Sequence, residues 1–177
     1  MKRFVTGVVE GCSVFLSEAS PANAHSYKGW PGHKTSLLWS TDKGPALPLD
    51  MRGEPAPGAR VMPSVGETKL LLITFPPASV FADPAFNPGL YGAEAAQNLP
   101  GLIEAFEPDG SGMHRTASID YGVVLSGEVW LELDDGAERH LTQGDVVVQG
   151  GARHAWRNKS DADVTMLFVL IGADERG

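Results

Sequence analysis

The stretch DVVVQGGARHAWRN, residues 145–158, decides the fold class of this 177-residue chain. An apolar run of strand length enters a Gly150-Gly151 corner, and His154, Trp156 and Asn158 follow at alternate positions. Side chains two residues apart share one face of a strand, so His154 and Trp156 are predicted to point together into the interior of a sheet. The glycine corner lets the backbone turn tightly and sets the direction of the imidazole. We expect Asn158 to fasten the end of this strand by side-chain hydrogen bonds.

Short β-rich runs bounded by glycine and proline recur along the rest of the chain. Residues 35–41 (TSLLWST), 68–75 (TKLLLITF) and 164–173 (VTMLFVLIGA) have strand length and composition. Glu10-Gly11 lies between two further runs and is predicted to close a hairpin. Many short strands with turn residues between them predict an all-β sandwich or barrel.

Helix signals occur only within residues 83–112. Short helices are predicted at 93–98 and 100–106, the second opening on a proline, which suits the first helical turn. This segment is either a surface connection or a lid over the site, since long insertions in compact domains are often functional. The expected organisation is one structural domain in three parts: a β extension packing on the barrel (1–82), the insertion (83–112) and the core motifs (113–177).

Composition and charge exclude several classes of function. Hydrophobic residues make up 42% of the chain, as in a globular protein. A net charge of −8 without a basic stripe argues against a nucleic-acid partner. No apolar stretch reaches membrane-spanning length, and Glu10 interrupts the N-terminal run before it resembles a signal peptide, so we expect a cytoplasmic protein without membrane association. The single Cys12 cannot form an intrachain disulfide and is predicted to be a small core residue of the hairpin. No phosphate-binding loop, Ser-His-Asp series or CxxC pair is present, so no nucleotide cofactor is expected.

Residues 112–171 resemble the cupin superfamily through two motifs. The first consists of His114, Arg115 and Thr116, then Asp120, then Gly127 after six residues; the second consists of Gly144, Asp145, the Gly150-Gly151 corner, His154 and Asn158. The resemblance implies a cupin-type antiparallel β-barrel (a double-stranded β-helix or jelly roll) in which both motifs converge on one pocket. Two positions depart from the family pattern: Thr116 stands where metal-binding members carry a second histidine, and Asp120 stands where they carry glutamate.

The resemblance makes His114, Asp120 and His154 the candidate catalytic residues. Two imidazoles and a carboxylate are also a ligand set suited to Fe(II), Mn(II), Zn(II) or Ni(II). A metal-free pocket is the alternative, because the set lacks one histidine of the family pattern. Thr116, Trp156 and Arg153 are expected to contact the substrate.

Each remaining candidate has a structural role as its alternative. Asp120 can instead cap backbone amides or pair with Arg115 or Arg153. His25 and His33 are expected to be exposed in a loop rich in glycine and proline, from which either could supply a missing ligand. The other side chains are expected to be structural: solvent-facing His140, core Trp130, and Tyr121 packing on the opposite face of its strand.

The resemblance implies an enzyme acting on a small organic molecule inside the barrel. The expected chemistry is that of a lyase or isomerase (decarboxylation or dehydration), with His154 as general acid and base, or that of a dioxygenase with a bound metal. The alternative is a cupin that binds a small ligand without catalysis. A homodimer is expected, formed through residues 68–75 or through the N-terminal hairpin.

Overall fold

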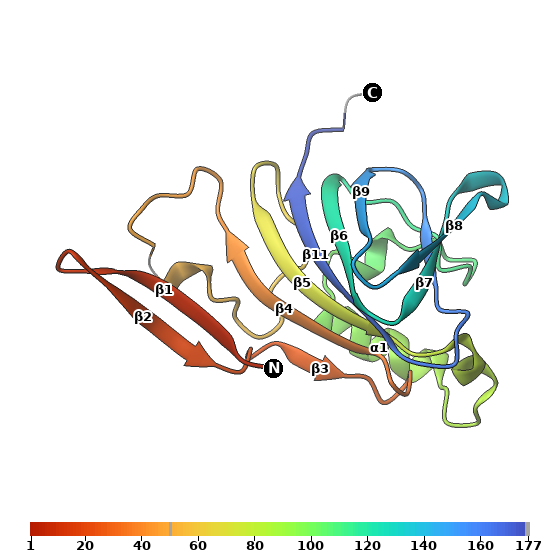
Figure 1. The fold of residues 1–177 in the computed structure, drawn as a ribbon. Coiled ribbons are helices and arrows are strands. Elements are labelled where there is room, and N and C mark those ends of the chain that lie inside the picture. Colours follow the sequence, from red (N-terminus) through yellow and green to blue (C-terminus); the bar gives the residue numbers. More distant parts are fainter. Residues whose placement is uncertain (50, 176–177) are drawn as a thin grey trace.

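A computed structural model describes residues 1–49 and 51–175 and shows a β-rich fold built around two sheets (Figure 1). The larger sheet has six strands in the order β3-β4-β5-β11-β6-β9, the smaller has the order β10-β7-β8, and β1-β2 form a separate hairpin. All the strand pairs are antiparallel, which confirms the predicted all-β class. The strand bounds are β1 (Arg3–Val9), β2 (Cys12–Ala19), β3 (Ala24–Ser26), β4 (Lys34–Thr41), β5 (Thr68–Phe75), β6 (Ser118–Ser126), β7 (Glu128–Glu132), β8 (Glu138–Thr142), β9 (Val146–Gly150), β10 (Ala155–Arg157) and β11 (Val164–Gly172).

Strand β11 lies in the middle of the large sheet and shows how the sequence pattern produces two unlike faces. Its residues alternate between buried and half-buried along the whole strand. Phe168 pairs with Leu71 of β5 and with Gly122 of β6, and all three face the interior. The core therefore fills the space between the inner face of the large sheet and the small sheet, with contributions from Val124, Val129, Val164, Met166, Phe168 and Leu170.

The N-terminal hairpin forms as predicted, but its cysteine does not enter a core. Glu10 and Gly11 both adopt positive φ angles, of 50° and 81°, as a tight turn between right-twisted strands requires. Cys12 is exposed, so its predicted role as a core residue is wrong. The hairpin is a two-stranded sheet of its own and buries mainly Val5.

The insertion contains one α-helix, α1 (Pro88–Asn98), which begins five residues before the predicted start. Asn87 caps it by accepting a hydrogen bond from the Leu90 amide (3.0 Å), and Pro88 occupies the first turn. The second predicted helix is reduced to a 3-10 turn at Ile103–Ala105. No helix in the described part of the chain is long and apolar enough to cross a bilayer.

His33 is buried, contrary to the prediction that it is exposed. Its ring stacks on Trp30 with 4.3 Å between centroids, and its Nδ1 donates to the carbonyl of Thr74 (2.9 Å). Burial lowers the pKa of His33 to about 4. His25 lies half-buried, 3.6 Å from Glu94. Neither histidine lines the central cavity, so neither supplies a ligand there.

Strand β5 cannot serve as the predicted dimer-forming edge. It lies between β4 and β11 and pairs with both, so its backbone amides and carbonyls are already used within the sheet. An edge strand needs one unpaired side to extend a partner's sheet. That part of the dimer prediction is therefore wrong.

Candidate functional site

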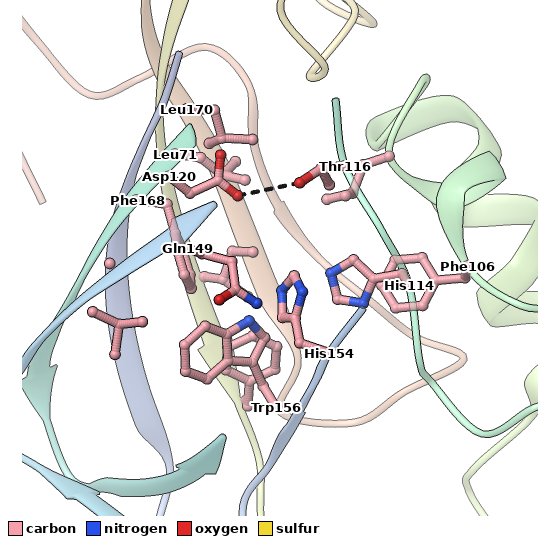
Figure 2. Close-up of a pocket in the computed structure, with 15 residues that line it drawn as sticks. Leu71, Phe106, His114, Thr116, Asp120, Gln149, His154, Trp156, Phe168 and Leu170 are labelled. Atoms are coloured by element: carbon pink, nitrogen blue, oxygen red, sulfur yellow. Dashed lines mark hydrogen bonds between the residues drawn. The ribbon is translucent and has the colours of Figure 1, made fainter. Parts of the chain in front are cut away.

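The site is a cavity of about 60 Å³ between the two sheets (Figure 2). Most of its wall is apolar and comes from the inner faces of β5 and β11, from the smaller sheet and from the insertion. Its polar side chains come from the two sequence motifs and from β9. The lining residues are Leu71, Ile73, Phe75, Leu102, Phe106, His114, Thr116, Asp120, Gly122, Val147, Gln149, His154, Trp156, Phe168 and Leu170.

His114 and His154 meet because their backbones form an isolated antiparallel bridge. The amide of each residue donates to the carbonyl of the other, at 2.9 Å in both directions. Side chains of directly opposed residues lie close together, and the two imidazole centroids are 4.2 Å apart. The predicted convergence of two imidazoles is thus present in the structure.

Backbone carbonyls determine which nitrogen of each ring carries the proton. Nδ1 of His154 lies 2.9 Å from the carbonyl of Ala152, and Nδ1 of His114 lies 3.3 Å from that of Gly112. A carbonyl only accepts, so each Nδ1 donates and each Nε2 keeps a free lone pair in the neutral ring. This is the state of an imidazole that can act as a base or as a metal ligand.

Burial keeps both rings neutral. It lowers the pKa of His114 to about 4, with a further contribution from the neighbouring His154, and it also lowers the pKa of His154. Phe106 stacks on His114 with 4.2 Å between centroids, and Trp156 presents its edge to His154 at 5.8 Å. Aromatic neighbours therefore fix both imidazoles and exclude water from them.

Asp120 shares the cavity but faces Thr116 (Figure 2). Its Oδ2 accepts a hydrogen bond from the Thr116 hydroxyl (3.4 Å), whereas its Oδ1 is buried without a partner. Burial raises the pKa of this carboxyl. The alternative ion pair of Asp120 with Arg153 is not formed, because Arg153 pairs with Glu107 and Asp134, and the carboxyl of Asp120 accepts from the hydroxyl of Thr116 instead of from a guanidinium.

The predicted metal set is not assembled in this geometry. Among residues 1–49 and 51–175, no three His, Cys, Asp or Glu side chains are grouped closely enough to hold one ion. His114 and His154 offer two nitrogen donors, one short of the three protein ligands that catalytic metal sites usually have. The residues that line the cavity therefore do not fit a metal ion that needs three protein ligands.

Arg153 is the one predicted substrate contact that the structure places elsewhere. Its neighbour His154 points inward, so Arg153 points outward and pairs with Glu107 (2.6 Å) and Asp134 (2.8 Å). These pairs tie the insertion to the smaller sheet. Thr116 and Trp156, the other two predicted contacts, do line the cavity.

Two parts of the site were not predicted from the sequence. Gln149 projects into the cavity from β9, opposite Asp120 in the strand register. The sequence did mark Gln149, because it is a polar residue at the end of the apolar run VVVQ and lies on the same face of the strand as Val147. Leu102 and Phe106 close the cavity from the insertion; both lie in the segment predicted as a helix (100–106), but that pattern did not show which side chains face the site.

The remaining polar and aromatic candidates have structural roles. Asn158 fastens the end of β10 as predicted, because its Nδ2 donates to the carbonyls of Phe75 (3.0 Å) and Ala162 (2.7 Å). His140 lies on the surface beside Glu128 (2.8 Å) and stacks on Trp130. Trp130 is half-buried on the outer side of β7 and does not belong to the core, so its predicted core position is wrong. Tyr121 lies on the outer face of β6, where it is partly exposed.

Residues 102–170 match the family model of the cupin domain. The chain contains a cupin domain. The matched range includes both imidazoles, Thr116, Asp120 and Trp156. It confirms the resemblance inferred from the two motifs.

Curated fungal proteins share this cupin domain. The chain is 58% identical over 62 residues to phomopsin biosynthesis cluster protein C' of Diaporthe leptostromiformis, covering 34% of this chain and 33% of that protein. It is 52% identical over 64 residues to the cupin-domain-containing oxidoreductase virC of Hypocrea virens, covering 34% and 33%. The matched part of the chain thus spans about a third of the length of these relatives.

Among solved structures, a Cupin 2 conserved barrel domain protein from Salinispora arenicola CNS-205 is similar to this chain. The TM-score is 0.42 at 16% identity, with 86% of this chain and 83% of that chain covered.

Proposed function

We propose that this protein is an enzyme that moves a proton on a small, uncharged organic substrate held in the cupin cavity. The observation that carries the proposal is the pair of neutral imidazoles, each with Nδ1 tied to a backbone carbonyl and its ring lining an apolar cavity. A base that is unprotonated at neutral pH and shielded from water is suited to accepting a proton from a C–H or O–H group.

The charge of the lining defines the substrate class. None of the described residues that line the cavity is lysine or arginine. The ionisable groups there are His114, His154 and Asp120, and burial shifts the pKa of each toward its neutral form. A substrate carboxylate or phosphate would lose its hydration without gaining a cationic partner, which is strongly unfavourable. Neutral aldehydes, ketones and alcohols fit this lining.

The size of the cavity limits the substrate as well. About 60 Å³ is less than half of the roughly 150 Å³ known to admit a benzene ring. A substrate of ring size therefore requires some of the lining side chains to move. We propose that Leu102 and Phe106 do so, because they come from the insertion and not from a strand of either sheet.

His154 is proposed as the base, because its Nδ1 is held by the shorter hydrogen bond and its pKa is lowered by burial alone, whereas that of His114 is lowered by burial and by the neighbouring imidazole. It accepts the substrate proton at Nε2. The Asp120 carboxyl, whose raised pKa lets it keep its proton to higher pH, returns a proton at a second position. Loss of a proton to His154 and gain of the Asp120 proton at a second position isomerises the substrate, whereas a hydroxyl group that takes the Asp120 proton leaves as water and the substrate is dehydrated. In both cases the imidazolium of His154 then gives its proton back to Asp120 through solvent after the product leaves. Decarboxylation is disfavoured because its substrate is an anion.

An oxidoreductase is the second candidate function, because relatives such as virC carry that name. Its chemistry would require a redox-active group or metal and an electron acceptor, of which dioxygen is one. A cupin that binds a neutral ligand without catalysis is the third reading. All three candidate functions use the same cavity, so the experiment must distinguish them by the reaction that each one predicts.

The test is deuterium exchange into carbon acids in D₂O, followed by proton NMR with cyclopentanone and 2-cyclohexenone as probes and 4-oxopentanoate as the anionic comparison. We expect exchange of the neutral probes that falls by about 100-fold or more in His154→Ala, the usual contribution of a general base. His140→Ala is the matched control, because this histidine lies on the surface.

Three outcomes would contradict the proposal. They are unchanged exchange in His154→Ala, faster exchange of the anion, and turnover seen only as oxygen consumption by protein loaded with Fe(II) and abolished by EDTA. The last outcome would favour the oxidoreductase. Binding of the neutral probes without exchange would favour the ligand-binding reading.

A further inference from the structure

Gln149 is a buried amide in the wall of the cavity, and most of its hydrogen-bonding capacity is unused. The residue is only 6% exposed, and its side chain projects from β9 into the apolar space between the sheets. Within the described part of the chain, its side chain makes one long hydrogen bond, from Nε2 to the carbonyl of Ala152 (3.5 Å). A side-chain amide can donate two hydrogen bonds and accept two more. Because a buried amide with so few partners destabilises the folded protein, its presence points to a ligand.

The amide of Gln149 lies between the proposed base and the proposed acid. The carbonyl of Ala152 contacts both Nε2 of Gln149 (3.5 Å) and Nδ1 of His154 (2.9 Å), so the amide and the imidazole are neighbours. Figure 2 shows the amide nitrogen turned toward the ring of His154. In the strand register Gln149 is directly opposite Asp120 of β6, and opposed side chains on one face lie close together. A substrate that reaches both His154 and Asp120 therefore contacts this amide.

Few of the described residues that line the cavity can donate a hydrogen bond to a substrate. Both imidazoles offer Nε2 as an acceptor, because each Nδ1 donates to a backbone carbonyl. The hydroxyl of Thr116 donates to Asp120 (3.4 Å). Apart from the proton that Asp120 transfers, the remaining donors are the amide of Gln149 and the indole N–H of Trp156. Gln149 is the better placed of the two, since it adjoins both the base and the acid.

We propose that Gln149 donates a hydrogen bond from its amide nitrogen to the carbonyl oxygen of the substrate. This assignment narrows the neutral substrates to ketones and aldehydes that carry a C–H group beside the carbonyl. A carbonyl oxygen only accepts, so it is complementary to the unused N–H of the amide. An alcohol without a carbonyl group would not present this acceptor beside the C–H group that loses its proton.

The catalytic part of the assignment rests on the proposed proton transfer. As the C–H bond breaks, the proton goes to Nε2 of His154 and the electron pair of that bond forms a C=C bond. The π pair of the carbonyl moves to its oxygen, which becomes an enolate oxygen. The N–H of Gln149 stabilises the negative charge that develops there, and return of a proton to carbon restores the carbonyl.

Gln149→Leu removes the donor and keeps about the same side-chain volume. Since leucine leaves no buried amide short of partners, we expect this variant to melt at the same temperature as wild type or at a higher one. Gln149→Met is the second variant if the leucine variant does not fold. Gln97→Leu is the matched control, because Gln97 is exposed on α1.

Selectivity for a carbonyl over a hydrocarbon of the same shape tests the binding part without reference to catalysis. Cyclopentanone and methylenecyclopentane are the two probes, and titrations followed by ligand NMR give their dissociation constants. We expect the ratio of the ketone constant to the alkene constant to rise about tenfold in Gln149→Leu, because the ketone loses one buried hydrogen bond and its oxygen is left without a partner. The ratio should stay at the wild-type value in Gln97→Leu.

Deuterium exchange into cyclopentanone in D₂O tests the catalytic part. We expect exchange at saturating ketone to be about 100-fold slower in Gln149→Leu, as is usual when one donor to a developing oxyanion is removed. His154→Ala should also lose exchange but should keep the selectivity ratio of wild type. The donor and the base therefore have different signatures.

The inference would be overturned by a selectivity ratio that is unchanged in Gln149→Leu, or by one that rises only in Trp156→Phe. Wild-type protein that does not bind the ketone would overturn it as well. Exchange that depends on His154 but not on Gln149, with an unchanged ratio, would remove Gln149 and leave the proposed function intact. Selectivity that depends on Gln149 in a wild-type protein without exchange would instead overturn the proposed function and keep Gln149 as the carbonyl-binding residue.

Discussion

Replacing Asn158 by alanine should destabilise the protein strongly, although this residue touches no substrate. Its Nδ2 donates to the carbonyls of Phe75 (3.0 Å) and Ala162 (2.7 Å). Its Oδ1 accepts from the amide (3.0 Å) and the hydroxyl (2.7 Å) of Ser160. The side chain is buried and joins the end of β10 to the end of β5, so it fixes the strand that carries Trp156 into the cavity.

The magnitude follows from these four hydrogen bonds. A buried hydrogen bond contributes about 1 kcal/mol net, and leaving a buried carbonyl without a donor costs about 1–3 kcal/mol. Asn158→Ala removes all four bonds and leaves the carbonyl of Phe75 without this donor. We expect the free energy of unfolding to fall by about 3–4 kcal/mol, a large fraction of the usual 5–15 kcal/mol. Urea unfolding followed by tryptophan fluorescence measures this change.

Two further variants distinguish the contributions of the donor and acceptor hydrogen bonds of the Asn158 side chain. Ser160→Ala removes only the hydroxyl contacts and should cost about 1 kcal/mol. Asn158→Asp keeps the acceptor but places a carboxylate oxygen against two carbonyls, so it should be at least as unstable as Asn158→Ala. A loss below about 1 kcal/mol for Asn158→Ala, or an Asp variant as stable as wild type, would refute the reasoning.

Three other predictions concern pH, backbone strain and thiol exposure. His33 has a pKa of about 4 when folded, below its ordinary value of 6.5, so the unfolded chain binds this proton more readily between these values. The stabilisation that comes from keeping His33 neutral is complete above about pH 6.5, and the free energy of unfolding falls by about 3 kcal/mol as the pH decreases toward 4. Urea unfolding at several pH values should show a smaller loss of stability with decreasing pH in His33→Phe. Gly127 has φ +77°, and an added Cβ would lie 2.7 Å from the Asp163 carbonyl oxygen, so Gly127→Ala should cost about 2–3 kcal/mol. Gly136 has a similar φ, +72°, but no atom lies within 4 Å of an added Cβ, so Gly136→Ala should lower the free energy of unfolding by only about 1 kcal/mol. Urea unfolding measures the change for both glycine variants. Cys12 is exposed, so one thiol per chain should react with a disulfide reagent in the native protein; reaction only after denaturation would contradict the hairpin geometry.

The sequence by itself determined the predicted strands, the glycine corners between them and which side chains of the second motif face inward. Alternation of side chains along a strand is a local property, so His154 and Trp156 could be placed on one face without knowledge of their neighbours. The role of Asn158 was likewise readable, because it follows the same alternation at the end of that strand. The opposing motif supplied His114, and the antiparallel bridge confirms that both imidazoles meet.

Only the tertiary structure decided which groups face one another. Asp120 enters the cavity as predicted, but its carboxylate turns to Thr116 instead of joining the imidazoles. Alternation with the inward-facing His154 directs Arg153 outward, but only the structure shows that Glu107 of the insertion pairs with it. Phe106 closes the cavity from the end of a segment predicted to be a helix, which the structure shows to be a 3-10 turn (Ile103–Ala105). The ion pair of Arg153 joins segments far apart in the chain, and the turn of Asp120 toward nearby Thr116 depends on how the packed cavity desolvates the carboxyl group; no local pattern encodes these packing and desolvation energies.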